Sequence, residues 1–189
     1  MRSARLERLR SDDGYTLVEI MVVAGLVATL GAMSVFGVQT MLPTVWSDAA
    51  LDQVVSAMRV GRESAINQRR PVEVRFFAPN QIQLVRIEAA AEVVLAQVVL
   101  ESNPSFMTTA GLPDTPDAFG AAAAWDFGGA NRVRFLADGT FTDGAGIPVN
   151  GSVFIGTPGN PMAARAVTVT GVTGRAAAYR WNGRVWEEK

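Results

Sequence analysis

The chain contains no cysteine and no histidine, and its only lysine is the terminal Lys189. Without cysteine it can form neither a disulfide framework nor a thiolate metal site. Without histidine it lacks the usual general base of enzyme active sites and the commonest transition-metal ligand. We therefore expect a protein that is not an enzyme and that uses no cofactor.

Oxygen ligands for a metal ion are present, but their spacing is wrong for a known site. Five aspartates fall in loop-like sequence, namely Asp114, Asp117, Asp126, Asp138 and Asp143. None of them follows the D-x-D-x-D-G order of a calcium-binding loop. The pairs Asp138-Gly139 and Asp143-Gly144 are typical of tight turns instead. We expect no metal site.

The charges of the chain are nearly balanced, with 17 basic and 18 acidic residues in 189. A net charge of −1 gives no overall basic field that would attract nucleic acid. The length leaves room for one folded domain beyond a membrane anchor.

The longest uncharged run lies near the N-terminus. No side chain from Ile20 to Val38 carries a charge, and a helix needs about 20 apolar residues to cross a bilayer. Glu19 stands at the start of this run. A carboxylate near the bilayer centre costs about 2.5–3.5 kcal/mol, and less toward the edge, so it is usually kept for a partner. The alternative is a plain membrane helix whose terminal glutamate reaches the interface.

The residues before this run are arginine-rich. Residues 1–13 contain four arginines and three acidic residues, 4 − 3 = +1, which favours retention of this end in the cytoplasm. An ordinary signal peptide would have a shorter apolar stretch of about 7–15 residues and an Ala-x-Ala-like site after it. We therefore expect the remainder of the chain to face the periplasm.

The junction Gly14-Tyr15-Thr16-Leu17-Val18-Glu19 resembles the processing and assembly signature of type IV prepilins and pseudopilins. In that family a membrane peptidase cuts after the glycine and methylates the new N-terminus. The resemblance implies cleavage after Gly14 and N-methylation of Tyr15, where most members have phenylalanine. It also implies that the Glu19 carboxylate neutralises the α-amino group of a neighbouring subunit during filament growth, since either charge alone is unfavourable in lipid.

The resemblance implies three parts and a set of partners. Residues 1–14 would be a cytoplasmic leader, 15–42 a transmembrane and assembly helix, and 43–189 a periplasmic pilin-like α+β domain. The implied partners are a prepilin peptidase, the other subunits of the filament and the lipid of the inner membrane.

A second helical pattern follows Pro43. Ser47 and Asp48 offer an N-cap, and apolar residues then recur every three or four positions up to Pro71. This apolar stripe consists of Leu51, Val54, Val55, Met58, Ala65 and Ile66. The pattern allows two helices broken at Pro43 or one long helix kinked there.

The sequence of the second half of the chain predicts β-structure. Residues 71–77 and 81–88 alternate apolar and polar side chains and predict a hairpin packed on the helix. Further strands are predicted at 132–136, 152–156, 166–171, 176–181 and 184–186, and 93–100 is predicted as a strand rather than a helix. Asn182-Gly183 predicts a hairpin turn before the last of these strands. Residues 102–131 predict a long loop, with a short helix at 118–124. The predicted fold class is α+β, a long N-terminal helix packed on antiparallel sheet.

Parts of this half narrow the resemblance to the GspH/FimT group of minor pseudopilins and minor pilins. The matching stretches are Val55 to Val74, Phe135 to Gly139, and Val167 to Gly171 with Gly174-Arg175. The group implies a minor pseudopilin of a type II secretion system, which helps to export proteins across the outer membrane. The alternative is a FimT-like minor type IV pilin that takes part in pilus assembly and DNA uptake.

The DNA alternative depends on the C-terminal arginines. Some FimT-like pilins capture DNA through a Gly-Arg-x-Arg element, and Gly174-Arg175-Ala176-Ala177 keeps only the first arginine. Arg175, Arg180 and Arg184, with aromatic residues between them, could form a strip that binds phosphates and stacks bases. The other interpretation is an amphipathic hairpin with a solvated arginine face.

Overall fold

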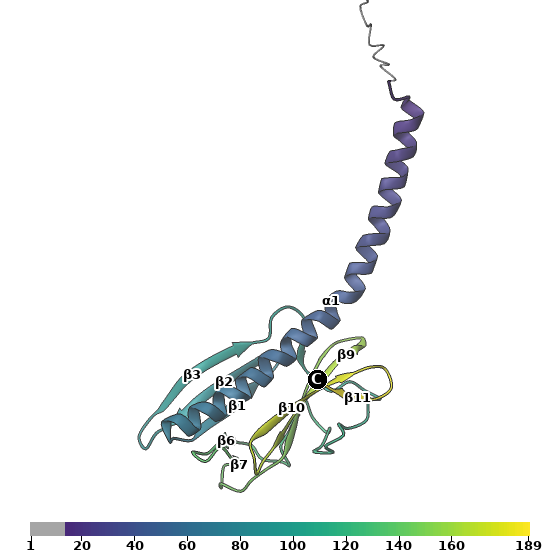
Figure 1. Cartoon of the computed structure of the whole chain (residues 1–189). Coiled ribbons are helices and arrows are strands. Elements are labelled where there is room, and N and C mark those ends of the chain that lie inside the picture. Colours follow the sequence, from purple (N-terminus) through teal and green to yellow (C-terminus); the bar gives the residue numbers. More distant parts are fainter. Residues whose placement is uncertain (1–13) are drawn as a thin grey trace, which may run out of the picture. The chain divides into compact units, whose positions relative to one another are not determined.

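The computed structural model describes residues 14–189 (Figure 1), so the predicted leader lies outside the described residues except for Gly14. The chain divides into two compact units, the first ending at Thr40 and the second comprising Met41–Lys189. Helix α1 (Leu17–Gln68) begins in the first unit and ends in the second, and all strands belong to the second.

Helix α1 passes through Pro43 without a break. A proline inside a helix removes one backbone hydrogen bond but does not have to end the helix. The alternative of two helices broken at Pro43 is therefore wrong. The predicted N-cap is wrong for the same reason, because Ser47 and Asp48 lie inside α1 and no helix begins there. Asp48 instead accepts a hydrogen bond from Arg165.

The first sheet has five antiparallel strands in the order β3-β2-β1-β6-β7. The strands are β1 (Val72–Phe77), β2 (Gln81–Ile87), β3 (Glu92–Val99), β6 (Val133–Phe135) and β7 (Phe141–Asp143). The hairpin of β1 and β2 and the strand near residues 93–100 are confirmed. The Asp138-Gly139 turn joins β6 to β7, and the positive φ of Gly139 (85°) explains why glycine stands there.

The second sheet is built on three long antiparallel strands. They are β8 (Gly151–Thr157), β9 (Asn160–Thr170) and β10 (Arg175–Trp181), followed by β11 (Trp186–Glu188). Two short strands, β4 (Ser105–Phe106) and β5 (Trp125–Asp126), both pair with β8. The predicted turn at Asn182-Gly183 connects β10 to β11. An α+β fold with antiparallel sheets is therefore confirmed.

The short helix predicted for residues 118–124 is wrong, because residues 118–121 have no regular structure and residues 122–124 form a bend. Ala118 has φ 53° and Gly120 has φ 111°, values that a right-handed helix does not allow. The Asp114 carboxylate accepts hydrogen bonds from the backbone N–H groups of Thr115 and Gly120. A side chain that binds nearby backbone groups in this way stabilises a loop in place of a helix.

The main core lies between the second part of α1 and the two sheets. Leu51, Val54 and Met58 are buried at helical spacing and belong to one apolar cluster with residues of both sheets. The predicted apolar stripe is confirmed at these positions and at Ala65, whereas Ile66 is exposed. A smaller cluster on the other face of the second sheet contains Phe154, Ala164, Ala166, Tyr179 and Trp186.

A fully buried arginine connects α1 to the second sheet. Arg165 of β9 donates from Nε to Asp48 Oδ1 at 2.7 Å and from Nη2 to the carbonyl of Thr44 at 3.3 Å. Its Nη1 donates to the carbonyls of Met162 and Ala164 at 2.9 and 2.8 Å. A buried cation is tolerated only when its donors are satisfied in this way.

We predict that Asp48→Ala lowers the free energy of unfolding by about 3 kcal/mol, because it leaves the buried Arg165 charge without its carboxylate. Asp52→Ala is the matched control. Asp52 lies one turn further along α1 and pairs with the exposed Lys189 at 2.8 Å, so its loss should change stability by less than about 0.5 kcal/mol. Denaturant unfolding followed by circular dichroism measures both. Equal effects of the two substitutions would contradict the role of Arg165.

Candidate functional site

The predicted processing and assembly residues lie at the start of α1. Thr16 precedes the first helical residue and accepts a hydrogen bond through Oγ1 from the backbone N–H of Glu19 at 3.2 Å. Thr-x-x-Glu at a helix start is a capping box, and a carboxylate in the first turn interacts favourably with the helix dipole. Thr16 was not among the predicted site residues, although this four-residue motif was the signal that could have found it.

The apolar run forms one exposed helical face with a single carboxylate. Tyr15, Glu19, Val23 and Val27 follow each other at four-residue spacing and line one surface. The window Leu17–Ser34 is long and apolar enough to cross a membrane, and none of it is buried. Glu19 makes no ion pair with any residue between Gly14 and Lys189. The described part of the first unit, residues 14–40, therefore presents an apolar surface and one acidic side chain, Glu19, without an ion pair to a described residue.

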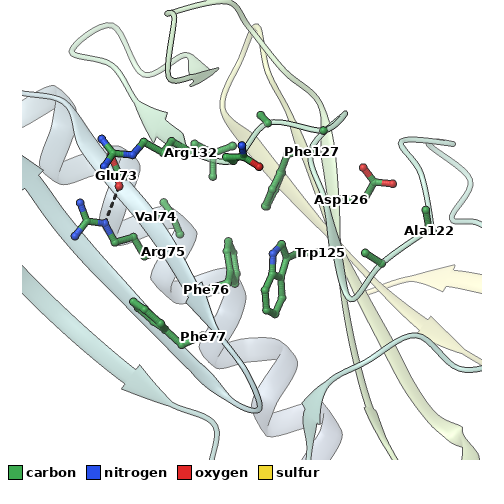
Figure 2. Close-up of a pocket in the computed structure, with 15 residues that line it drawn as sticks. Glu73, Val74, Arg75, Phe76, Phe77, Ala122, Trp125, Asp126, Phe127 and Arg132 are labelled. Atoms are coloured by element: carbon green, nitrogen blue, oxygen red, sulfur yellow. Dashed lines mark hydrogen bonds and ion pairs between the residues drawn. The ribbon is translucent and has the colours of Figure 1, made fainter.

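In the second unit, a cleft of about 540 Å³ lies between β1 and residues 122–133 (Figure 2). Strand β6 pairs with β1 only at Val72, Glu73 and Val74, so the edge of β1 beyond Val74 is open toward the cleft. Phe76 stacks on Trp125 with ring centroids 5.7 Å apart. The cleft therefore combines an aromatic wall with an unpaired strand edge.

Charged groups at the mouth of the cleft are bound to each other. Arg75 donates from Nη2 to Glu92 at 2.8 Å and from Nε to the buried Glu73 at 2.6 Å, as the dashed line in Figure 2 marks for Glu73. The hydrogen bonds from Arg75, first to Glu92 and then to Glu73, raise the pKa of the Arg75 guanidinium. Arg132 lies beside them and makes no ion pair with a described residue. The charges of Glu73, Arg75 and Glu92 are therefore satisfied within the protein.

The C-terminal arginines do not form one strip. Side chains alternate along β10, so Arg175 and Arg180 point to opposite faces of the sheet. Arg180 pairs with Glu187 at 3.6 Å, and Arg184 lies in the turn before β11. The structure thus separates Arg175 from Arg180, two of the three arginines that the DNA hypothesis requires together.

Two of the aromatic residues near these arginines, Tyr179 and Trp186, are occupied within the protein. Tyr179 is buried and donates from Oη to Asp117 at 2.9 Å, and Trp186 donates from Nε1 to the carbonyl of Pro113 at 2.9 Å. Thr168 also donates to Asp117, at 2.6 Å. These rings attach the loop around Asp117 to the second sheet and are not free to stack on bases.

Within residues 14–189, no group of three or more aspartate or glutamate side chains is placed to hold a metal ion. The loop aspartates bind backbone and hydroxyl groups instead. Asp138, for example, accepts hydrogen bonds from the hydroxyl and the N–H of Thr140, and these bonds lower the pKa of the Asp138 carboxyl.

Comparison with known proteins finds no matching family model and no matching curated protein. Solved structures do show similarity. The type IV minor pilin FimU of Pseudomonas aeruginosa is 13% identical over 68% of this chain and 84% of that chain, with a TM-score of 0.46. The minor pseudopilin EpsH of the Vibrio cholerae type II secretion system is 13% identical over 71% and 94%, with a TM-score of 0.49. At these values, the case for a family rests on the sequence motifs.

The environment of Tyr179 predicts an alkaline transition. Burial, and next the hydrogen bond to the Asp117 carboxylate, raise the pKa of Tyr179 to about 12 from its usual value of 10.0. Because the pKa of Tyr179 is higher in the folded state than in the unfolded state, the Tyr179 hydroxyl keeps its proton up to a higher pH in the folded chain. The protonated hydroxyl contributes its full stabilisation below pH 10, and this contribution is lost as the pH rises toward 12.

The chain has two tyrosines, so a Tyr15→Phe variant reports Tyr179 alone. Its tyrosinate absorbance should appear near pH 12 in the folded protein and near pH 10 in denaturant. Asp117→Asn should lower the pKa of Tyr179 in the folded state, because it removes the carboxylate charge beside the hydroxyl. Ionisation of Tyr179 at the same pH in the folded and denatured protein would contradict the assignment.

Proposed function

We propose that this protein is a minor subunit of a pilin-like filament in the bacterial cell envelope and that a prepilin peptidase processes it. The observation that carries the proposal is Glu19. It is a single carboxylate in the first turn of an exposed apolar helix, and this helix begins shortly after Gly14-Tyr15. An apolar surface from Leu17 to Ser34 is unfavourable in water, so it requires lipid before assembly and neighbouring helices afterwards.

In the proposed mechanism, each residue at the junction has a separate role. Gly14 is the residue after which the peptidase cuts, because it offers no side chain to the enzyme. Tyr15 then carries the new amino group and becomes methylated. Glu19 attracts the amino group of a neighbouring subunit in the membrane, where water screens the two charges poorly. This attraction aligns the incoming subunit with the base of the filament.

The specific system that we propose is the pseudopilus of a type II secretion system. The chain would sit in the inner membrane by its single apolar helix, with the domain of residues 43–189 in the periplasm, and would act structurally in protein export. The motif Gly174-Arg175 and the stretch Phe135 to Gly139 support the GspH/FimT group. The separation of Arg175 from Arg180 and the burial of Tyr179 favour this role over a FimT-like role in DNA uptake.

Processing gives the first test of the proposal. Co-expression with a prepilin peptidase should yield a chain that begins at N-methyl-Tyr15, and the protein expressed without the peptidase should keep its N-terminal residues. Intact-mass measurement of protein purified from membranes distinguishes these products. A peptidase-independent cut, or a cut beyond Val38, would exclude the filament role.

Glu19→Leu should leave a stable, processed membrane protein that fails to enter filaments, because the neighbouring amino group loses its counter-charge. Glu63→Leu is the matched control, since Glu63 is an exposed glutamate on the same helix. Co-purification with the other subunits after cross-linking measures incorporation. Normal incorporation of the Glu19→Leu protein would contradict the docking role.

A further inference from the structure

Exposed apolar side chains gather at the side of the second unit where α1 enters it. They are Met41 and Val45 of α1, Met162 at the start of β9, and Val185 in the turn between β10 and β11. We call these four residues the apolar end. Figure 1 shows the turns that flank β9 and β11 at this side of the unit, away from β6 and β7.

One buried arginine brings the parts of the apolar end together. Arg165 donates from Nη2 to the carbonyl of Thr44 and from Nη1 to the carbonyl of Met162, so α1 and β9 meet at a single guanidinium. A Cβ at Gly183 would lie 3.4 Å from the Met162 sulfur, and Gly183 belongs to the same turn as Val185. Residues that are far apart in the sequence therefore share one end of the unit.

The uncharged segment of the sequence continues into the apolar end. No side chain from Ile20 to Ser47 carries a charge, whereas a helix needs only about 20 residues to cross the hydrocarbon core. The surplus of about eight residues rises about 12 Å in a helix, which is more than the headgroup layer of about 5–8 Å on one side of a bilayer. Met41, Val45 and the half-buried Trp46 fall in this surplus. Tryptophan is typical of the membrane–water interface.

Exposure alone does not single out the apolar end. Val172, in the turn between β9 and β10, is exposed as well, and it lies beyond the opposite end of β9. Ten residues separate it from Met162, which is about 33 Å along a strand. Isolated apolar side chains on a surface are normal. The apolar end differs from Val172 because it continues an apolar segment that is unfavourable in water.

Chain connectivity also keeps the apolar end near the bilayer. The candidate membrane span ends at Ser34, and the seven residues from there to Met41 reach at most about 25 Å even when fully extended. Lipid is therefore always within reach of this end, whereas a second protein has to be recruited.

We propose that the apolar end lies in the headgroup layer of the membrane before the subunit enters a filament. This inference rests on the proposed membrane anchor. Met162 and Val185 exchange contacts with water for contacts with the upper part of the acyl chains. Arg184, which is exposed and makes no ion pair with a described residue, reaches the lipid phosphates from its place beside Val185.

Fluorescence quenching in vesicles tests this contact. The chain contains no cysteine, so one introduced cysteine carries a fluorescent label at one chosen position. The full-length protein is placed in vesicles of phosphatidylcholine and phosphatidylglycerol, with or without a lipid that bears a nitroxide on its headgroup. Labels on Met162→Cys and Val185→Cys should lose about half of their fluorescence, because they lie within about 10 Å of the headgroups. Val172→Cys is the matched control, and its label should lose less than about a tenth at its distance along β9.

A label on Met33→Cys separates this proposal from the membrane anchor. Met33 lies in the window Leu17–Ser34, so a nitroxide on the lipid acyl chains should quench its label. Absence of this quenching would overturn the anchor and the lipid contact together. Quenching at Met33 while the labels at Met162 and Val185 behave like the label at Val172 would overturn only the lipid contact.

A charge placed at the apolar end gives a second readout. Adding Met162→Glu to the labelled Val185→Cys protein should weaken the quenching about twofold, because a carboxylate is unfavourable at the acyl chains. Val172→Glu is its control and should leave the quenching unchanged, and circular dichroism confirms that both variants are folded. Equal effects of the two glutamates would contradict the proposal. A Val185 label that becomes shielded only when other filament subunits are added would assign the apolar end to a protein interface and overturn the lipid contact.

Discussion

The buried guanidinium of Arg165 is the constraint on which the arrangement of the second unit depends. A charge removed from water is tolerated only if its donors meet acceptors, and four of the Arg165 hydrogen bonds go to Asp48, Thr44, Met162 and Ala164. Two of these acceptors lie on α1 and two on β9. The position of the helix against the second sheet is therefore set by directional bonds as well as by apolar packing, which alone would tolerate sliding. This position places one face of α1 in the core and leaves Arg59 beside β10.

The aromatic cleft of the second unit arises where a short strand stops pairing with a longer one. Strand β6 leaves β1 unpaired beyond Val74. Open edges carry free N–H and carbonyl groups, which proteins usually cover or use for recognition. Phe76 and Trp125 lie beside this edge and line the cleft with aromatic rings.

Much of the fold was predictable because the patterns act over short distances. Alternating side chains identified β1 and β2, and the Asn182-Gly183 pair identified the turn before β11. The predicted N-cap and the predicted short helix were wrong for different reasons. Ser47 and Asp48 have the chemistry of a helix start, and residues 118–124 have the composition of a helix, but a distant arginine decides the first case and a nearby carboxylate the second. Arg165 engages Asp48 within a continuous helix, and Asp114 binds the backbone of the loop. The Thr16 cap was missed although its motif is local.

The sequence by itself determined the apolar N-terminal helix with Glu19 at its start, the α+β class and the main turns. Helical and strand periods and glycine turns need only neighbouring residues, so they can be recognised without a fold. Only the tertiary structure decided which charged residues share a surface. It separated Arg175 from Arg180 by the alternation of β10, brought Arg175 to Arg59, and buried Arg165 against Asp48. Electrostatic and hydrogen-bond energies depend on distance in space, and for residues far apart in the chain the fold alone sets that distance.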